Sequence, residues 1–200
     1  MPTTEIPIRT FIAIEPPPDL EGAIRNLQVQ LKQRLAFPAM RWVQPHGIHL
    51  TLKFLGDVPP SRLPTIQDAL AALAARHSPF TLAARGLGVF PGPSRPSVLW
   101  LGLAGDLPRL HRLRDDVEAA IAPLGYPTES RPFRPHLTLA RIKDAAPSDS
   151  ERIRDLLRQP PAADLGALPA AAIHLMRSDL SPQGARYTPL GVYPLAGEAG

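Results

Sequence analysis

The sequence predicts an α+β fold in which one unit occurs twice and forms two lobes around a cleft. Three observations support this prediction. The pattern His-apolar-Thr-apolar occurs at His49 and again at His136, 87 residues later. Strand and helix patterns follow one another in the order strand–helix–strand–helix–strand in both halves. An apolar content of 44% with 20% charged residues is typical of a folded globular chain. We expect a single bilobal domain over residues 1–200, with the repeat boundary near 90–96.

The first half begins with an apolar run that is closed by three prolines and is typical of a buried strand. A helix with leucines every three or four residues follows, and we expect Asp19 to cap it. A proline turn then leads into the first His-x-Thr strand, which we expect to end at Gly56. A second helix is expected to begin at Ser61. The flanking strands of this half are expected at 9–14 and 80–89, and residues 41–43 are expected to lead into the proline turn.

The second half repeats this order. Asp106 is expected to cap a helix with an apolar stripe, and the second His-x-Thr strand begins at His136. Ser148 and Glu151 have the spacing of a capping box and predict a short helix. The remaining strands are expected at 97–103, 171–176 and 185–193.

The spacing of the motif residues predicts which of them share a face. Alternate side chains of a strand point to opposite faces. We therefore expect His49, Thr51 and Lys53 to face outward, while Phe54 points inward with the leucines. The second copy repeats this alternation.

Two such strands side by side would place two imidazoles and two hydroxyls around one small cavity. Histidine changes charge near neutral pH, so a pair can divide into one acid and one base. Hydrolysis of a phosphodiester needs a base for water, an acid for the leaving oxygen, and donors for the phosphoryl oxygens. We therefore interpret His49, His136, Thr51 and Thr138 as a phosphate site.

Composition excludes several other classes of site. The chain has no cysteine, which excludes disulfides, a thiol nucleophile and a zinc–thiolate centre. No window approaches the roughly 18 apolar residues of a membrane span. Because Glu5 stands near the start and no long apolar run follows, we expect no signal peptide and a cytoplasmic protein. The net charge of +4 comes mainly from arginine, which suits phosphate recognition, although a GC-rich genome would give the same excess of arginine over lysine.

The two motifs, His49-Leu50-Thr51-Leu52 and His136-Leu137-Thr138-Leu139, resemble the paired signature of the two-histidine phosphoesterases. Within that superfamily the chain resembles the bacterial and archaeal RNA 2′,3′-cyclic phosphodiesterases, also called 2′-5′ RNA ligases. The resemblance covers nearly the whole chain. It includes Arg9 to Ile14, Arg41-Trp42-Val43, Leu52 to Gly56, Phe133 to His136 and Gly184 to Tyr187.

The resemblance implies a fold and an activity. The fold would have two antiparallel sheets flanked by helices around a central cleft. The activity would open a terminal 2′,3′-cyclic phosphate of RNA to a 2′-phosphomonoester without metal or cofactor, and its reversal would form a 2′-5′ linkage. The expected partner is RNA with such ends, tRNA fragments included. We expect a monomer with no membrane association and no obligate protein partner.

The resemblance also implies roles for individual residues. His49 would donate a proton to the 3′ leaving oxygen and His136 would accept one from water. The two motifs are nearly symmetric, so the sequence alone does not orient donor and acceptor. Thr51 and Thr138 would hold the phosphate, and Arg141 would contact it. Strict alternation places Arg141 on the face opposite His136, so this contact requires a bulge in the strand.

Other interpretations stay open on the sequence alone. The substrate of the same two histidines is alternatively a small cyclic phosphate of a nucleotide or of ADP-ribose. A module that binds RNA ends without catalysis is a second alternative. A metallohydrolase is a third, although no carboxylate or cysteine stands at ligand spacing. Phe11, Trp42 and Phe133 are candidates either for base stacking or for the core.

Overall fold

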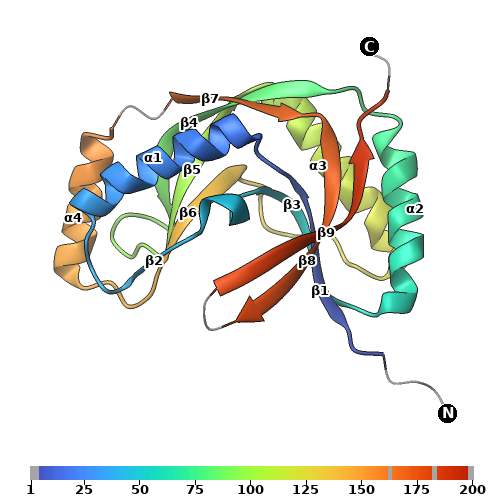
Figure 1. Cartoon of the computed structure of the whole chain (residues 1–200), viewed down its shortest axis with the longest axis horizontal. Helices are drawn as coiled ribbons and strands as arrows, with labels where there is room; N and C mark the ends of the chain where they lie inside the picture. The colour runs from blue at the N-terminus through green and yellow to red at the C-terminus, as the bar shows by residue number, and fades with distance from the viewer. Residues whose placement is uncertain (1–4, 162–163, 182–183, 198–200) are drawn as a thin grey trace.

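The chain alternates strands and helices in two similar halves (Figure 1). The computed structural model describes residues 5–161, 164–181 and 184–197. The strands are β1 (Ile8–Ile14), β2 (Met40–Trp42), β3 (Leu50–Val58), β4 (Phe80–Phe90), β5 (Val98–Gly105), β6 (His136–Ile142), β7 (Asp164–Ala170), β8 (Ala172–Ser181) and β9 (Gly184–Pro194). The α-helices are α1 (Pro18–Arg34), α2 (Leu63–Ala74), α3 (Leu107–Ile121) and α4 (Pro147–Arg158), and short 3₁₀ turns are η1 (Pro45–Gly47), η2 (Pro60–Arg62) and η3 (Ala122–Leu124). The expected strand–helix–strand–helix–strand order is confirmed in both halves.

The strands form one antiparallel sheet, in the order β7-β4-β5-β6-β3-β1-β8-β9, with β2 paired to β6. We call β7-β4-β5-β6 with β2 the β6 lobe, and β3-β1-β8-β9 the β3 lobe. The expectation of two antiparallel sheets is refined here, because the pair Leu50–Leu137 joins the two lobes into one continuous sheet. Equivalent strands of the two lobes follow the same order outward from the centre of the sheet. A His-x-Thr strand, β6 or β3, is innermost in each lobe, and β5 or β1 comes next.

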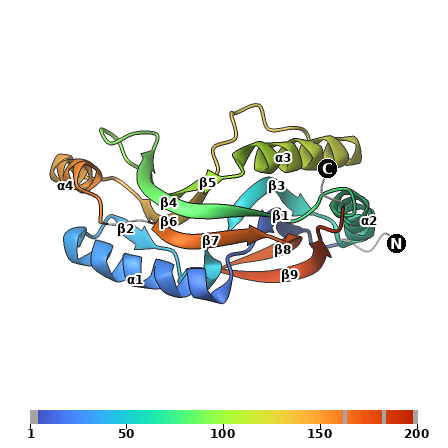
Figure 2. The ribbon, with the colours of Figure 1, turned by 90° about the horizontal axis from the view of Figure 1, so that it is seen from above.

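The chain interleaves the two lobes. Helix α1 follows β1 of the β3 lobe but packs behind the β6 lobe, where its Gln28 side chain bonds the Leu139 carbonyl. Helix α3 follows β5 of the β6 lobe but packs against β3. Figures 1 and 2 show α1 and α4 at one end of the molecule and α2 and α3 at the other. The pseudo-repeat boundary near 90–96 stays a prediction; these residues connect β4 to β5.

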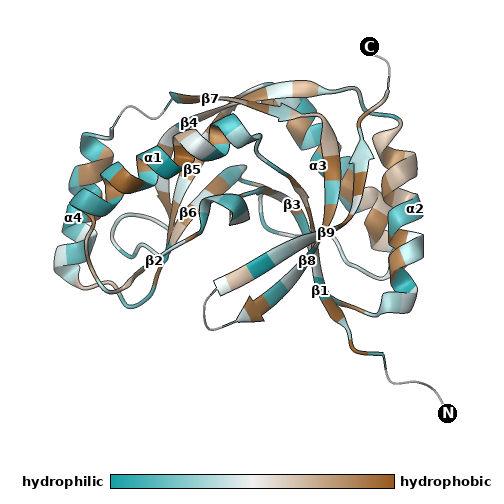
Figure 3. Cartoon of the chain, in the orientation of Figure 1, coloured by the Kyte–Doolittle hydropathy of each residue, from teal (hydrophilic) through white to brown (hydrophobic). Residues whose placement is uncertain are grey.

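The helices and strands bury a shared apolar core. The buried residues of α1 and α3 have nearly the same spacing, as expected from the apolar stripes. They are Leu20, Ile24, Leu27 and Leu31 in α1, and Leu110, Leu113, Val117 and Ile121 in α3. Each such side chain stabilises the fold by about 1.5–3 kcal/mol. Figure 3 shows hydrophobic and hydrophilic residues alternating along the strands.

Two of the three predicted helix caps are wrong. The Asp106 side chain accepts from the Arg109 backbone N–H at 3.2 Å, as expected. Helix α1 instead begins at Pro18, with Asp19 inside its first turn. Proline suits this position because its missing N–H has no helical partner there. Helix α4 begins at Pro147, so the capping box of Ser148 and Glu151 does not form, and the Asp149 carboxylate accepts from the Ala146 N–H at 3.1 Å.

Other boundaries also differ from the prediction. The first His-x-Thr strand runs from Leu50 to Val58 and does not end at Gly56, which lies inside the strand with a φ of 75°. The turn η2 precedes α2, so Ser61 lies before the helix. Strand β7 is missing from the prediction because it buries only Leu168 and Ala170 and shows little apolar alternation. Within the described residues, no helix has the length and apolar composition needed to cross a bilayer.

Candidate active site

The pair Leu50–Leu137 sets the arrangement of the two motifs. Because β3 and β6 are antiparallel, this pair places His49 opposite Thr138 and Thr51 opposite His136. The two buried leucines face the core, so the four polar side chains share the opposite face. Each histidine therefore lies next to the threonine of the other motif. The repeat thus produces a compact, crossed set of two imidazoles and two hydroxyls.

A β-bulge in each motif strand changes the alternation just beyond the threonine. In β3, Leu52 is skipped in the pairing with β1, and in β6 Leu139 is skipped in the pairing with β5. A one-residue bulge moves every later side chain to the other face. The predicted orientations of Lys53 and Phe54 are therefore wrong. Lys53 is buried behind the sheet, and Phe54 is 65% exposed and lines the cleft.

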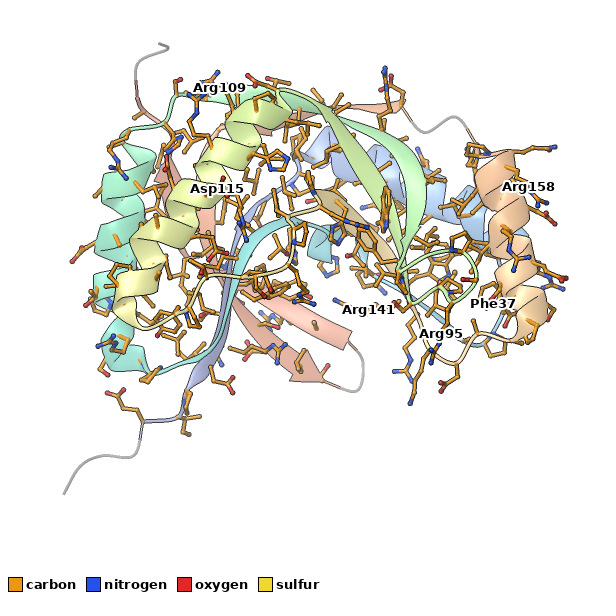
Figure 4. All side chains as sticks on the ribbon, turned by 180° about the vertical axis from the view of Figure 1, so that it is seen from behind. Phe37, Arg95, Arg109, Asp115, Arg141 and Arg158 are labelled. Atoms are coloured by element: carbon orange, nitrogen blue, oxygen red, sulfur yellow. The ribbon has the colours of Figure 1, made fainter. Side chains whose placement is uncertain are left out.

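The predicted contact of Arg141 with the phosphate requires a bulge in the strand, and the bulge at Leu139 provides it. Arg141 is exposed and lines the same cavity as the two histidines. Its positive charge lowers the pKa of both His49 and His136. Figure 4 shows Arg141 near the middle of the molecule, whereas Arg109 and Arg158 lie on the outer helices α3 and α4.

A buried polar side chain supports each bulge from behind. The Gln28 amide of α1 donates to the carbonyls of Val43, at 2.8 Å, and Leu139, at 3.1 Å. In the other lobe, the Glu118 carboxylate of α3 accepts a hydrogen bond from Lys53. Gln28 and Glu118 hold corresponding positions in the buried stripes of their helices. Both bulges are thus fixed by contacts to a helix.

His49 lies against aromatic rings. Its ring stacks on Phe11 at 4.4 Å between centroids and meets the edge of Tyr187 at 4.9 Å. Gly47 permits this contact, because a Cβ there would lie 3.3 Å from the Tyr187 ring. Burial lowers the pKa of His49 to about 4, although a hydrogen bond to the Gly47 backbone opposes this shift. The imidazole is therefore neutral at pH 7 in the free protein.

His136 has a similar environment on the other side. Its Nδ1 lies 2.7 Å from the Arg134 carbonyl, which can only accept, so Nδ1 carries the proton. The other ring nitrogen, Nε2, is left free to accept a proton. Burial lowers the pKa of His136, and Arg141 lowers it further. The ring also meets Phe90 at 5.0 Å between centroids.

All five predicted site residues line one cavity of about 560 Å³ between the lobes. They are His49, Thr51, His136, Thr138 and Arg141. Of the aromatic candidates, Phe11 is 2% exposed, and Trp42 and Phe133 pack against the core. Phe11 lines the cavity together with Phe54 and half-buried Tyr187, and of these three Phe54 is the exposed one. Sequence alternation alone misses Phe54, because the bulge that exposes it lies within an unbroken apolar pattern.

The other histidines lie outside this cavity, as their lack of a motif predicts. His77 pairs with Asp116 at 2.9 Å, and His174 lies 3.1 Å from Glu15. His111 meets the edge of Phe133. In the described part of the chain, no three His, Asp or Glu side chains gather in a geometry suited to a metal ion.

This fold, with a His-x-Thr strand on each side of a central cleft, defines a duplicated phosphoesterase. The LigT like Phosphoesterase family model matches twice in succession, over residues 14–100 and 101–187. The chain therefore belongs to the LigT-like phosphoesterase family.

Similar proteins are known from several organisms. A relative named RNA 2′,3′-cyclic phosphodiesterase, from Geobacillus stearothermophilus, is 34% identical over 94% of this chain, which spans 57% of that protein's length. A crystal structure of a protein from Thermus thermophilus matches with a TM-score of 0.78 and 32% identity, covering 96% of this chain and 100% of that one. The crystal structure of Escherichia coli LigT complexed with 3′-AMP matches with a TM-score of 0.71 and 29% identity, covering 94% and 98%.

Proposed function

We propose that this protein opens the terminal 2′,3′-cyclic phosphate of RNA and leaves a 2′-phosphomonoester. The observation that carries the proposal is the crossed set of His49, Thr51, His136 and Thr138 in one cavity with Arg141. The name of the Geobacillus relative supports the substrate class. The E. coli LigT complex with 3′-AMP supports the binding of a nucleotide phosphate in this fold.

In the proposed reaction the cyclic phosphate lies between the two histidines. The threonine hydroxyls and the Arg141 guanidinium hold its non-bridging oxygens. His136 Nε2 takes a proton from water, the water oxygen bonds to phosphorus, and the bond from phosphorus to the 3′ oxygen breaks. His49 gives its proton to that oxygen. The products are a 2′-phosphate and a 3′-hydroxyl. If the 5′-hydroxyl of a second RNA strand takes the place of water, the same bond to the 3′ oxygen breaks and the product is a 2′-5′ linkage.

The bound phosphate has a second role in this proposal. Both histidines have a lowered pKa in the free protein, and the acid must nevertheless carry a proton. A phosphate anion between the two rings favours the imidazolium form and raises the pKa of the acid. Substrate binding therefore favours protonation of His49, and the reaction uses that proton.

The test is incubation of an RNA oligomer ending in a 2′,3′-cyclic phosphate with the protein in chelator. We expect a 2′-phosphate product, identified by its isomer, and a rate at least about a hundredfold lower in His49→Ala and in His136→Ala. Thr51→Ala and Thr138→Ala should lose less, since each removes one donor among several. A 3′-phosphate product, or full activity in folded histidine variants, would reject the proposal. Opening of only small cyclic nucleotides would favour the small-molecule alternative.

A further inference from the structure

A pair of arginines extends from the cavity along β6 and β2. The register of these strands places Arg41 directly opposite Arg141. Directly opposite residues of an antiparallel pair lie on the same face, so Arg41 is on the cleft face. Val43 supports this placement, because it stands two residues after Arg41, continues the pairing with β6 and lines the cavity. Arg41 itself does not line the cavity, but it lies directly beside Arg141, which does.

This pair is unfavourable in the free protein. Like charges directly opposite each other on a sheet repel. Both side chains are exposed, and within residues 5–161, 164–181 and 184–197 neither has a carboxylate within ion-pair distance. A ligand with two negative charges at the spacing of the guanidinium groups would remove the repulsion and bind both. The pair therefore suits a ligand with more than one phosphate.

We propose that Arg41 binds the internucleotide phosphate on the 5′ side of the terminal nucleotide while Arg141 contacts the cyclic phosphate. This inference rests on the proposed function, since it takes the terminal phosphate to lie between His49 and His136. A cyclic mononucleotide carries one phosphate and engages only Arg141. An RNA chain engages both arginines, so Arg41 makes the protein prefer chain ends to free cyclic nucleotides.

The experiment compares adenosine 2′,3′-cyclic phosphate with the dinucleotide ApA ending in the same cyclic phosphate. Arg41→Gln should lower kcat/KM for the dinucleotide about tenfold, as expected for the loss of one charge-assisted contact, and change that for the mononucleotide less than twofold. The matched control is Arg25→Gln, which removes an exposed arginine of α1 outside the cleft. It should alter neither substrate. Equal losses on both substrates, or no loss on either, would overturn the inference.

A binding measurement separates this inference from the proposed function. The fluorescence anisotropy of a labelled oligonucleotide ending in a 2′-phosphate is followed against salt concentration. Arg41→Gln should reduce the slope of log affinity against log salt by about one phosphate contact. If wild type opens neither substrate, the proposed function fails, and this slope still decides the role of Arg41. The melting temperature of Arg41→Gln should equal or exceed that of wild type, since a repulsion is removed.

Discussion

Phe54 and Arg141 hold equivalent positions in the two lobes. Each stands five residues after the histidine of its motif, and a one-residue bulge turns each toward the cavity. The two halves of the cleft therefore differ at this point, with an aromatic ring on one side and a cation on the other. A nucleotide has the matching asymmetry, a planar base and a charged phosphate.

Arg141→Gln should raise the pKa of both histidines. The guanidinium lies near both imidazoles and disfavours their protonated forms, so its removal makes protonation easier. NMR titration of the histidine ring protons in the free protein measures this change. Arg95→Gln, in the loop between β4 and β5, is the control and should leave both titrations unchanged. Unaltered titrations in Arg141→Gln would show that the Arg141 guanidinium does not influence the pKa of either histidine.

Phe54→Ala should weaken nucleotide binding with little loss of stability. The ring is 65% exposed, so its removal should change the free energy of unfolding by less than about 0.5 kcal/mol. Stacking of a base on an aromatic side chain contributes about 1–3 kcal/mol, so KM should rise roughly tenfold. Val29→Ala, at an exposed residue of α1, is a matched control. Unchanged kinetics in Phe54→Ala would exclude stacking at this position.

Gln28→Leu should lower activity from behind the sheet. The amide bonds the carbonyls of Val43 and Leu139, so its loss should cost about 1–3 kcal/mol of stability and loosen the bulge that orients Arg141. We expect kcat/KM to fall about tenfold, whereas Asn26→Leu on the exposed face should be near neutral.

A double-mutant cycle separates orientation of Arg141 from general destabilisation. If Gln28 acts through Arg141, adding Gln28→Leu to Arg141→Gln should cost much less activity than it does in wild type. Fully additive losses would show that Gln28 affects stability alone.

The stability of the protein should fall between about pH 6.5 and pH 4. In the unfolded chain His49 takes up a proton near its ordinary pKa of 6.5, while in the folded protein it does so only at about 4. Its contribution is therefore complete above pH 6.5 and is lost as the pH falls through this window. The loss is on the order of 3 kcal/mol. Urea unfolding of His49→Gln should show a flatter pH dependence, and an unchanged slope would contradict the burial of this imidazole.

The pH dependence of the rate should differ between kcat/KM and kcat. The first reports the free enzyme, in which both histidines have a lowered pKa. Its optimum should therefore lie below about pH 6.5. The second reports the complex, in which the phosphate raises the pKa of the acid, so its optimum should lie at higher pH. Both profiles should be bell-shaped, and the apparent pKa values of their limbs should describe the coupled pair of histidines and not either residue alone. Coinciding optima, or flat profiles from about pH 5 to 9, would argue against histidine acid–base catalysis.

The sequence predicts the repeated strand–helix order because the apolar stripes of α1 and α3 are regular and dominate the burial. It also predicts that the two motifs meet, because alternation leaves their histidines and threonines on one face. It fails at Lys53 and Phe54, since a bulge inserts one residue into the pairing without any change in apolar pattern. It also places the helix starts of α1 and α4 wrongly, because Asp19 and Ser148 are typical caps and each lies directly after the proline at which the helix begins.

The two lobes have equivalent strands in mirrored order, and this symmetry suggests how an asymmetric cleft can arise. A chain of only the first half would hold β1 and β3 of the β3 lobe together with β2 and β4 of the β6 lobe, so neither lobe would be complete. Its simplest closed form is a symmetric pair of identical copies that exchange strands. In such a pair the position after each bulge carries the same residue twice. Covalent fusion removes that constraint, so one copy can carry a ring at this position while the other carries a charge.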